Sequence, residues 1–272
     1  MKNNLIVLTT VNMILALTSA GQIISFDHPP GTNQIGEKLY MDQYEVSNIA
    51  FLEYQHWTKI IFGLNSDEYK KTQIDSSIVT NEYLNNPVYH EYPVIGISYD
   101  QASSFCKWRS DRVYEMTLIK NKLVKKNRNQ NKDSYFSLEN IKNGKYKIKK
   151  PEKLKSIKYP QYRLPSSAEW EYAALGDKDI EIFLNSSESV IYIRDLKNPG
   201  LVKVNESEVL PPNKYNLVNM FGNVSEIVSE KGLAKGGNWK TKLDELSIKN
   251  SVLYTLPSEW LGFRCLCEFI SP

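Results

Sequence analysis

One stretch of the sequence, from Asn216 to Trp239, concentrates residue types that can bind a metal ion. It reads NLVNMFGNVSEIVSEKGLAKGGNW and spaces carboxamide, glycine and carboxylate groups two to four residues apart. Asn219 and Glu226 offer side-chain oxygens. The carbonyl groups of Gly222 and Val224 could add two more, and calcium takes several such oxygens from flexible loops. A tight turn in which Asn and Glu hydrogen-bond backbone groups explains the same spacing, so the residues alone leave both interpretations open.

The sulfur chemistry of the chain rests on three cysteines, Cys106, Cys265 and Cys267. In an oxidising compartment, three cysteines permit at most one internal disulfide and leave one thiol over. Zinc is not indicated, because the three histidines are scattered along the chain and do not combine with the cysteines into a spaced ligand set.

Capping signals predict the helices that position these groups. Ser98 and Gln101 form a capping box, in which two side chains satisfy backbone amides at a helix start, so Cys106 is expected on a helix. A second capping box at 166–169 predicts a short helix over residues 167–175.

The rest of the chain has the pattern of short strands and long loops. Ser47 is expected to cap a helix through Phe62, which Gly63 ends, and residues 65–86 are expected to be a loop. Strands are predicted at Lys38–Val46, Val190–Ile193, Leu233–Trp239 with a turn at Gly236-Gly237, and Trp260–Phe269. Residues 87–97 are expected to form a short strand pair or an extended strand that enters a helix.

The N-terminus has the pattern of a secretory signal peptide. Lys2 precedes an apolar run over residues 5–17, and small residues follow at 18–21, so we expect residues 1–20 to be removed. No cysteine precedes Cys106, which leaves no lipid-anchor cysteine. We therefore expect an exported protein of the periplasm or cell surface, with one globular domain over residues 21–272.

Basic residues are concentrated in one segment. Between Lys120 and Lys158 there are 14 Lys or Arg against 3 Asp or Glu, a surplus of 11, whereas the whole chain carries +3 and the remainder therefore −8. We interpret residues from about 112 to 160 as an insertion, with a hairpin at Asn143-Gly144. It is either a solvated, mobile segment or a surface for an acidic partner. Nucleic acid is not expected as the partner of an exported chain.

Taken in order, six pieces of the sequence resemble the formylglycine-generating enzyme family, also called the sulfatase-modifying factor family. They are YEVSN at 44–48, PVIGISY at 93–99 with CKW at 106–108, YRLPSSAEWEYAA at 162–174, NMFGNVSE at 219–226, KGGNW at 235–239 and LGFRC at 261–265. The resemblance implies an α+β, C-type-lectin-like fold with much irregular structure.

The resemblance also implies one calcium site. In the family's loop the ligands are an Asn or Asp three residues before the glycine, the glycine carbonyl, the carbonyl two residues later, and the glutamate. The matching positions here are Asn219, Gly222, Val224 and Glu226. A second calcium site of the active members has no recognisable match between residues 176 and 214.

A disulfide is implied in the same way. The family pairs the cysteine of the capped helix with the cysteine of the terminal GFRC, which gives a bond between Cys106 and Cys265. Cys267 is then the remaining thiol. We expect it to point to the same face of its strand as Cys265 and to be buried and inert.

The chain departs from the active members at their copper site. Those enzymes oxidise a substrate cysteine with copper held by two cysteines between the GG-turn strand and the terminal strand. The corresponding segment, residues 240–261, contains no cysteine, and Cu(I) requires soft thiolates. We therefore expect no copper, no catalytic residues and no formylglycine synthesis. The iron-dependent branch is also unexpected, since its histidine triad has no match.

A non-catalytic branch matches better. Gliding-motility and type 9 secretion lipoproteins K and J of the Bacteroidota are similar in the WRSDRVYEM wording at 108–116 and in the inserted block. We expect a calcium-stabilised structural and interaction module of the cell envelope, with an envelope or secretion-machinery protein as partner and at most a peripheral membrane association. The alternatives are a metal-dependent oxidoreductase of the superfamily with a divergent active site, and ligand binding in a lectin-like cleft.

Overall fold

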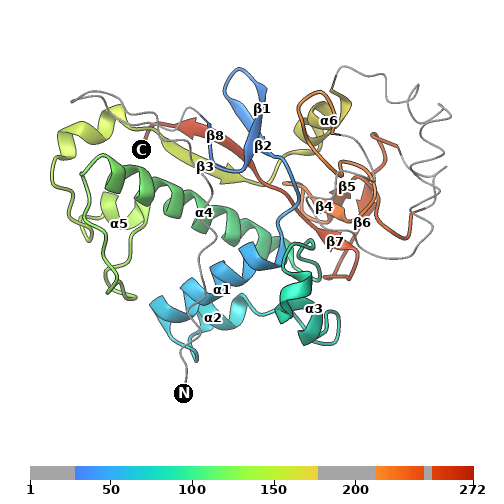
Figure 1. Ribbon diagram of the computed structural model, residues 1–272, viewed down its shortest axis with the longest axis horizontal. Coiled ribbons are helices and arrows are strands. Elements are labelled where there is room, and N and C mark those ends of the chain that lie inside the picture. The colour runs from blue at the N-terminus through green and yellow to red at the C-terminus, as the bar shows by residue number, and fades with distance from the viewer. Residues whose placement is uncertain (1–27, 177–211, 242–246) are drawn as a thin grey trace.

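The computed structural model of the chain describes residues 28–176, 212–241 and 247–272 (Figure 1). The helices are α1 (Asn48–Phe62), α2 (Asp67–Lys71), α3 (Asn81–Asn85), the 3-10 helix η1 (Pro87–Tyr89), α4 (Tyr99–Lys120), α5 (Leu138–Lys142), the 3-10 helix η2 (Pro151–Ser156) and α6 (Ser167–Leu175). The strands are β1 (Thr32–Gly36), β2 (Leu39–Asp42), β3 (Tyr159–Arg163), β4 (Ser225–Ile227), β5 (Leu233–Lys235), β6 (Val252–Leu253), β7 (Leu261–Gly262) and β8 (Leu266–Ile270). The fold is α+β, as the sequence predicts. The predicted signal peptide and the strand predicted at 190–193 lie outside the described residues.

The first sheet is antiparallel and carries the main core. Its strand order is β1-β2-β8-β3, so the last strand of the chain lies between two strands from far earlier in the sequence. Cys267 lies opposite Tyr40 on one side and opposite Tyr162 on the other. These three residues belong to one buried cluster, whereas Leu266 and its partner Met41 belong to a second. Both faces of the sheet are therefore covered, because successive side chains point to opposite faces.

Helix α4 covers one face of the first sheet, and α1 packs against α4 on the side away from the sheet (Figure 1). The predicted capping box at the start of α4 is present. The backbone N–H of Gln101 donates to the Ser98 hydroxyl, and the backbone N–H of Ser98 donates to the side-chain oxygen of Gln101. Phe105 of α4 stacks on Phe51 of α1 with ring centroids 6.0 Å apart. Within the described ranges, no helix is long and apolar enough to cross a membrane.

The second sheet is small and has the order β6-β5-β4-β7, with β4 and β7 parallel and the other pairs antiparallel. The predicted turn after β5 occurs at Gly236 and Gly237, whose φ angles are 90° and 67°. A Cβ atom at Gly236 would lie 2.8 Å from the Met220 carbonyl oxygen and 3.0 Å from the Trp170 ring. Only glycine fits there, since both the left-handed backbone and the contact distance exclude a side chain.

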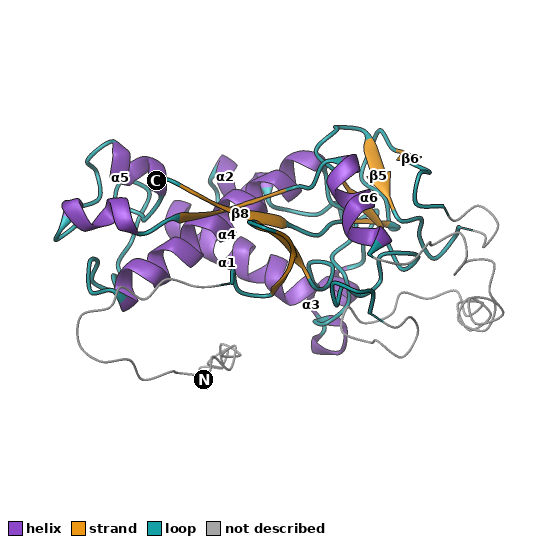
Figure 2. Cartoon of the chain, turned by 90° about the horizontal axis from the view of Figure 1, so that it is seen from above, coloured by secondary structure: helices purple, strands orange, loops and turns teal. Residues whose placement is uncertain are grey.

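The basic insertion is packed, which corrects the expectation of a solvated, mobile segment. Phe136 is fully buried and joins a cluster with Tyr114 and Leu118 of α4. Arg112 of α4 donates to the Phe136 carbonyl and lies 4.6 Å from the Trp57 ring centroid. Figures 1 and 2 place the insertion and the second sheet at opposite ends of the long axis.

The predicted hairpin at Asn143-Gly144 is wrong. Ser137 caps α5 by accepting from the Asn140 amide at 3.0 Å, so the residues before the turn are helical. Gly144 has a φ of 69° and turns the chain after this helix. Gly144 is a turn residue, as predicted, but the cap at Ser137 favours a helix on the N-terminal side of the turn.

Three further expectations differ from the structure. The expected loop at 65–86 contains α2 and α3, which are capped by Ser66 and Thr80. The predicted strand at 87–97 begins instead as η1, and only an isolated bridge from Pro93 to Ser47 follows. The predicted strand at 260–269 is divided into β7 and β8, which belong to different sheets.

Candidate functional site

The four predicted calcium ligands lie together in the buried loop that leads into β4. Asn219 and Glu226 are 4% and 1% exposed, and Gly222 and Val224 are also buried. The loop bends sharply because Asn219, Gly222 and Asn223 all have positive φ angles, a conformation that Asn and Gly adopt more readily than other residues. The Gly222 amide donates to the Gly236 carbonyl at 2.9 Å and so ties the loop to the glycine turn.

Arg264 lies against Glu226 and neutralises it. The Arg264 Nη2 is 2.6 Å from the Glu226 Oε1, and the Nε is 2.7 Å from the Oε2. The two side chains are 0% and 1% exposed, so the ion pair is shielded from water. Trp170 of α6 donates its indole N–H to the Glu226 Oε2 at 2.7 Å. The carboxylate therefore connects the second sheet, α6 and the segment before β8.

The same guanidinium also holds the backbone around it. It donates to the Val218 carbonyl at 2.8 Å and to the Asp42 and Gln43 carbonyls at 3.2 and 3.3 Å. Because an arginine carries five N–H donors in a planar fork, one side chain fixes the end of β2 and the start of the loop together.

A second buried carboxylate, Glu45, faces this loop. Its Oε1 accepts from the Asn223 amide group at 2.8 Å, and its Oε2 accepts from the Asn219 amide group at 3.3 Å. Burial raises the pKa of Glu45 to about 7, partly offset by the positive charge of Arg264. The centre thus contains two carboxylates and one arginine without access to water.

In this arrangement protein donors already engage the Glu226 carboxylate. Both of its oxygens accept hydrogen bonds from three N–H groups, the Nε–H and Nη2–H of Arg264 and the indole N–H of Trp170. A calcium ion at this loop would have to take the carboxylate from the guanidinium. Across the described part of the chain, this loop included, no three His, Cys, Asp or Glu side chains gather as a metal-ligand group.

The cysteine pair implied by the resemblance is brought together. The Cys106 and Cys265 sulfurs are 3.3 Å apart, and both residues are buried. The Cys265 amide donates to Asp42, whose carboxylate also accepts from Arg109 at 2.7 Å. Cys267 lies in the same buried cluster as the pair, and burial raises the pKa of its thiol. It is therefore a protonated core residue and a poor nucleophile.

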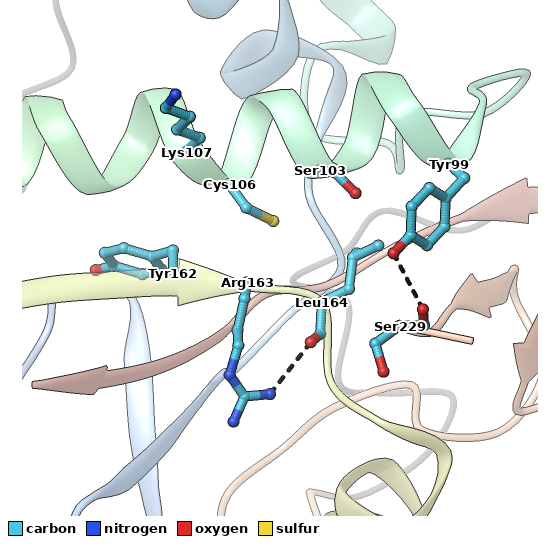
Figure 3. A pocket seen from close by; sticks show the side chains of 8 residues that line it. All are labelled: Tyr99, Ser103, Cys106, Lys107, Tyr162, Arg163, Leu164 and Ser229. Atoms are coloured by element: carbon cyan, nitrogen blue, oxygen red, sulfur yellow. Dashed lines mark hydrogen bonds between the residues drawn. The ribbon is translucent and has the colours of Figure 1, made fainter. Parts of the chain in front are cut away.

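A surface cleft of about 360 Å³ lies between α4 and the end of β3 (Figure 3). It is lined by Tyr99, Ser103, Cys106, Lys107, Tyr162, Arg163, Leu164 and Ser229. Two of its polar side chains are engaged with protein partners. The Tyr99 hydroxyl donates to the Ser229 carbonyl at 3.0 Å, and Arg163 pairs with Glu169 at 2.7 Å. Arg163 lowers the pKa of Glu169 to about 2, and Cys106 is only 1% exposed.

Three residues of the buried centre, Arg264, Glu45 and Trp170, were not identified as a unit from the sequence. A signal was available for Arg264, since it is the single basic residue in the apolar stretch WLGFRCLCEF. A charge buried in such a stretch requires a partner. Its partner Glu226 lies 38 residues away, and spacing alone does not connect them.

Comparisons with known proteins place the chain in a family. The family model described as Sulfatase-modifying factor enzyme 1-like domain matches residues 10–269. Among solved structures, variable protein 1 of Treponema denticola is similar at 16% identity and a TM-score of 0.47, over 85% of this chain and 84% of that chain. PvdO from Pseudomonas aeruginosa is similar at 15% identity and 0.46, over 85% and 80%, and CarF at 18% and 0.43, over 85% and 86%. No curated protein gives a match. Because the family model spans nearly the whole sequence, the chain belongs to the sulfatase-modifying factor family.

Proposed function

We propose that this chain is a non-catalytic structural and interaction module of the bacterial cell envelope. The observation that carries the non-catalytic part is the placement of the cysteines. All three lie in the core, at 1%, 0% and 0% exposure, and the sequence has none between Lys240 and Leu261. Copper oxidation of a substrate thiol needs soft thiolate ligands that the substrate can reach, and no cysteine of this chain is in such a position.

The test is turnover of a peptide with a sulfatase motif by the pure, copper-loaded protein. We expect no formylglycine in the peptide by mass spectrometry, and its formation would overturn the proposal. Metal analysis of the purified protein is the companion measurement. Stoichiometric copper or iron would favour the alternative, a metal-dependent oxidoreductase with a divergent active site.

The envelope role rests on the N-terminal signal-peptide pattern and on the similarity to gliding-motility and type 9 secretion lipoproteins K and J. The partner we propose is an envelope or secretion-machinery protein, contacted by the long loops, because binding residues are commonly placed on loops over a rigid scaffold. Fractionation of cells that produce the tagged full chain is the direct test. We expect the protein in the periplasm or at the cell surface, and cytoplasmic recovery would overturn this role.

Calcium at the loop from Asn219 to Glu226 is a separate proposal. Its support is the oxygen donors of Asn219, Gly222 and Val224, and it requires Glu226 to leave Arg264. We expect calcium to raise the melting temperature of the wild type but not of Asn219→Gly, which removes one donor and tolerates the φ of 55°.

The matched control for the calcium test is Asn216→Gly, at an exposed residue of the same loop with a φ of 57°. This variant should keep the full calcium shift. Equal shifts in both variants would place the ion elsewhere, and an unchanged wild-type melting temperature would remove calcium from the proposal.

A further inference from the structure

The basic insertion presents an unusually uniform charged surface. All 14 Lys and Arg residues from Lys120 to Lys158 are exposed. The three acidic residues of the segment are also exposed, and one of them, Glu139, lies 3.5 Å from Lys107 of α4. From Lys122 onward, no lysine or arginine of the insertion forms an ion pair with a described residue. The positive charge of this end of the molecule is therefore not neutralised internally.

The lysines are held outward by the packing of their neighbours. In the segment KYKIK, Tyr146 and Ile148 pack against the buried cluster around Phe136, whereas Lys145, Lys147 and Lys149 are exposed. Because the cluster holds the apolar side chains between them, the lysines themselves remain in solvent. The Lys149 amide also donates to the Leu123 carbonyl at 3.1 Å.

The following 3-10 helix η2 extends this arrangement. Leu154 packs against the same buried cluster, and Lys153 and Lys155 on either side of it are exposed. The five residues Lys145, Lys147, Lys149, Lys153 and Lys155 are called the lysine row below. Their positions are set by a packed core, which distinguishes them from charges on an unstructured tail.

The composition of this surface shows which partner it fits. Protein interfaces are enriched in aromatic residues and Arg and depleted in Lys, whereas residues 120–158 contain 13 Lys, one Arg and only buried or half-buried aromatic residues. The lysine ammonium group is a strongly hydrated point charge. Unlike the planar guanidinium of arginine, it does not need two acceptors in a fixed geometry. Such charges suit a diffuse negative surface, and each Lys near an anionic bilayer contributes about 1 kcal/mol.

We propose that the lysine row docks the protein peripherally on a bilayer of anionic lipids. The end of the molecule that carries the row lies far from the second sheet and its loops (Figures 1 and 2). Lipid contact therefore leaves those loops accessible to a protein partner. The proposal does not depend on the envelope role, and its failure leaves that role intact.

The test is co-sedimentation of the full chain with vesicles of phosphatidylcholine, with and without about one third phosphatidylglycerol. Binding to neutral vesicles measures any contribution of the apolar N-terminal run. The additional binding to anionic vesicles measures the electrostatic contribution. We expect the wild type to prefer anionic vesicles and to lose this preference as salt rises to about 0.5 M. Changing the whole lysine row to Gln should weaken anionic binding by at least about a hundredfold, since each lysine is worth about fivefold.

The matched control removes the same charge from other exposed positions, with Gln at Lys38, Lys59, Lys70, Lys71 and Lys231. It should retain most of the binding. Equal losses in the two variants, or equal wild-type binding to neutral and anionic vesicles, would overturn the proposal. Poly-glutamate stands in for an acidic protein partner. If it binds the wild type more tightly than anionic vesicles of equal charge do, the lipid proposal is overturned and an acidic protein is the partner. If the lysine-row variant fails to fold, the salt dependence of wild-type binding to anionic vesicles is the remaining test. Binding that does not weaken as salt rises would overturn the proposal.

Discussion

The ion pair of Arg264 with Glu226 is the most consequential contact at the scale of single residues. The two side chains are almost completely buried, and removing one member of such a pair leaves the other as an uncompensated charge. We expect Glu226→Gln to lower the free energy of unfolding by about 3–5 kcal/mol. Urea denaturation measures this loss directly.

An exposed ion pair supplies the control for that prediction. Glu259 pairs with Lys240, and both side chains are nearly half exposed. Glu259→Gln should change the free energy of unfolding by less than about 1 kcal/mol, because water screens a surface pair. Similar losses of unfolding free energy in the two variants would mean that Glu226 does not compensate the buried charge of Arg264.

Glu45 makes stability depend on pH. Burial raises its pKa from an ordinary value near 4.5 to about 7. Since the folded-state pKa lies above the unfolded value, the folded state holds the extra proton between these values, and the associated stability is lost as pH rises through about 7.

We expect the wild type to lose stability relative to Glu45→Gln between about pH 5 and about pH 8, because the amide does not titrate. Urea denaturation of both proteins across this range tests the expectation. A difference in unfolding free energy that stays constant with pH would show that Glu45 titrates normally.

At the scale of elements, the insertion has its own core and should respond to mutation as a unit. Phe136 is fully buried against Tyr114 and Tyr146. Phe136→Ala should cost about 3–5 kcal/mol through lost burial and the cavity left behind. We expect hydrogen exchange to accelerate first in residues 121–158, because elements with separate cores open separately.

Met116 provides the comparison for this prediction. It lies on α4 shortly before residues 121–158 but is 47% exposed, so Met116→Ala should change stability by less than about 1 kcal/mol. Exchange that accelerates equally in β2 and β8 of the Phe136→Ala variant would show that the insertion is not a separate cooperative unit.

The helices were predictable because their signals are local. The capping boxes at Ser98 and Ser166 place α4 and α6 within one residue of the predicted starts, since a cap satisfies amides only three residues away. The short helices α2 and α3 were missed because five residues give no periodicity to read. The hairpin at Asn143-Gly144 was wrongly predicted from its turn signal, which does not determine the structure on either side.

Contacts at the scale of the whole molecule were not predictable from spacing. The placement of β8 between β2 and β3 joins residues more than a hundred positions apart, and Arg264 reaches the Asp42 carbonyl across 222 positions. The residue types of the loop from Asn219 to Glu226 are recognisable in the sequence, but the arginine that binds its carboxylate comes from the segment between β7 and β8, 38 residues further along the chain. Local patterns carry no information on which distant charge fills a buried site.

The pairing of Cys106 with Cys265 is a prediction at this largest scale, because it would join α4 to the segment before β8. The two positions are 159 residues apart, and closing a loop of this length is worth about 5 kcal/mol in the chain-entropy model. We expect Cys106→Ser and Cys265→Ser to lower the melting temperature by similar amounts. The double variant should be no less stable than either single variant, since one bond is lost in each case.

Counting free thiols distinguishes a disulfide between Cys106 and Cys265 from two thiols that are only in contact. Protein purified under oxidising conditions and then unfolded should titrate one thiol, that of Cys267, and Cys267→Ser should titrate none. Three reactive thiols in the wild type, together with additive losses in the double variant, would show that the sulfurs only pack against each other. In that case the apolar core, the Arg109–Asp42 pair and the hydrogen bonds of Ser110 and Asp111 to β3 would connect the first sheet to α4 without a covalent link.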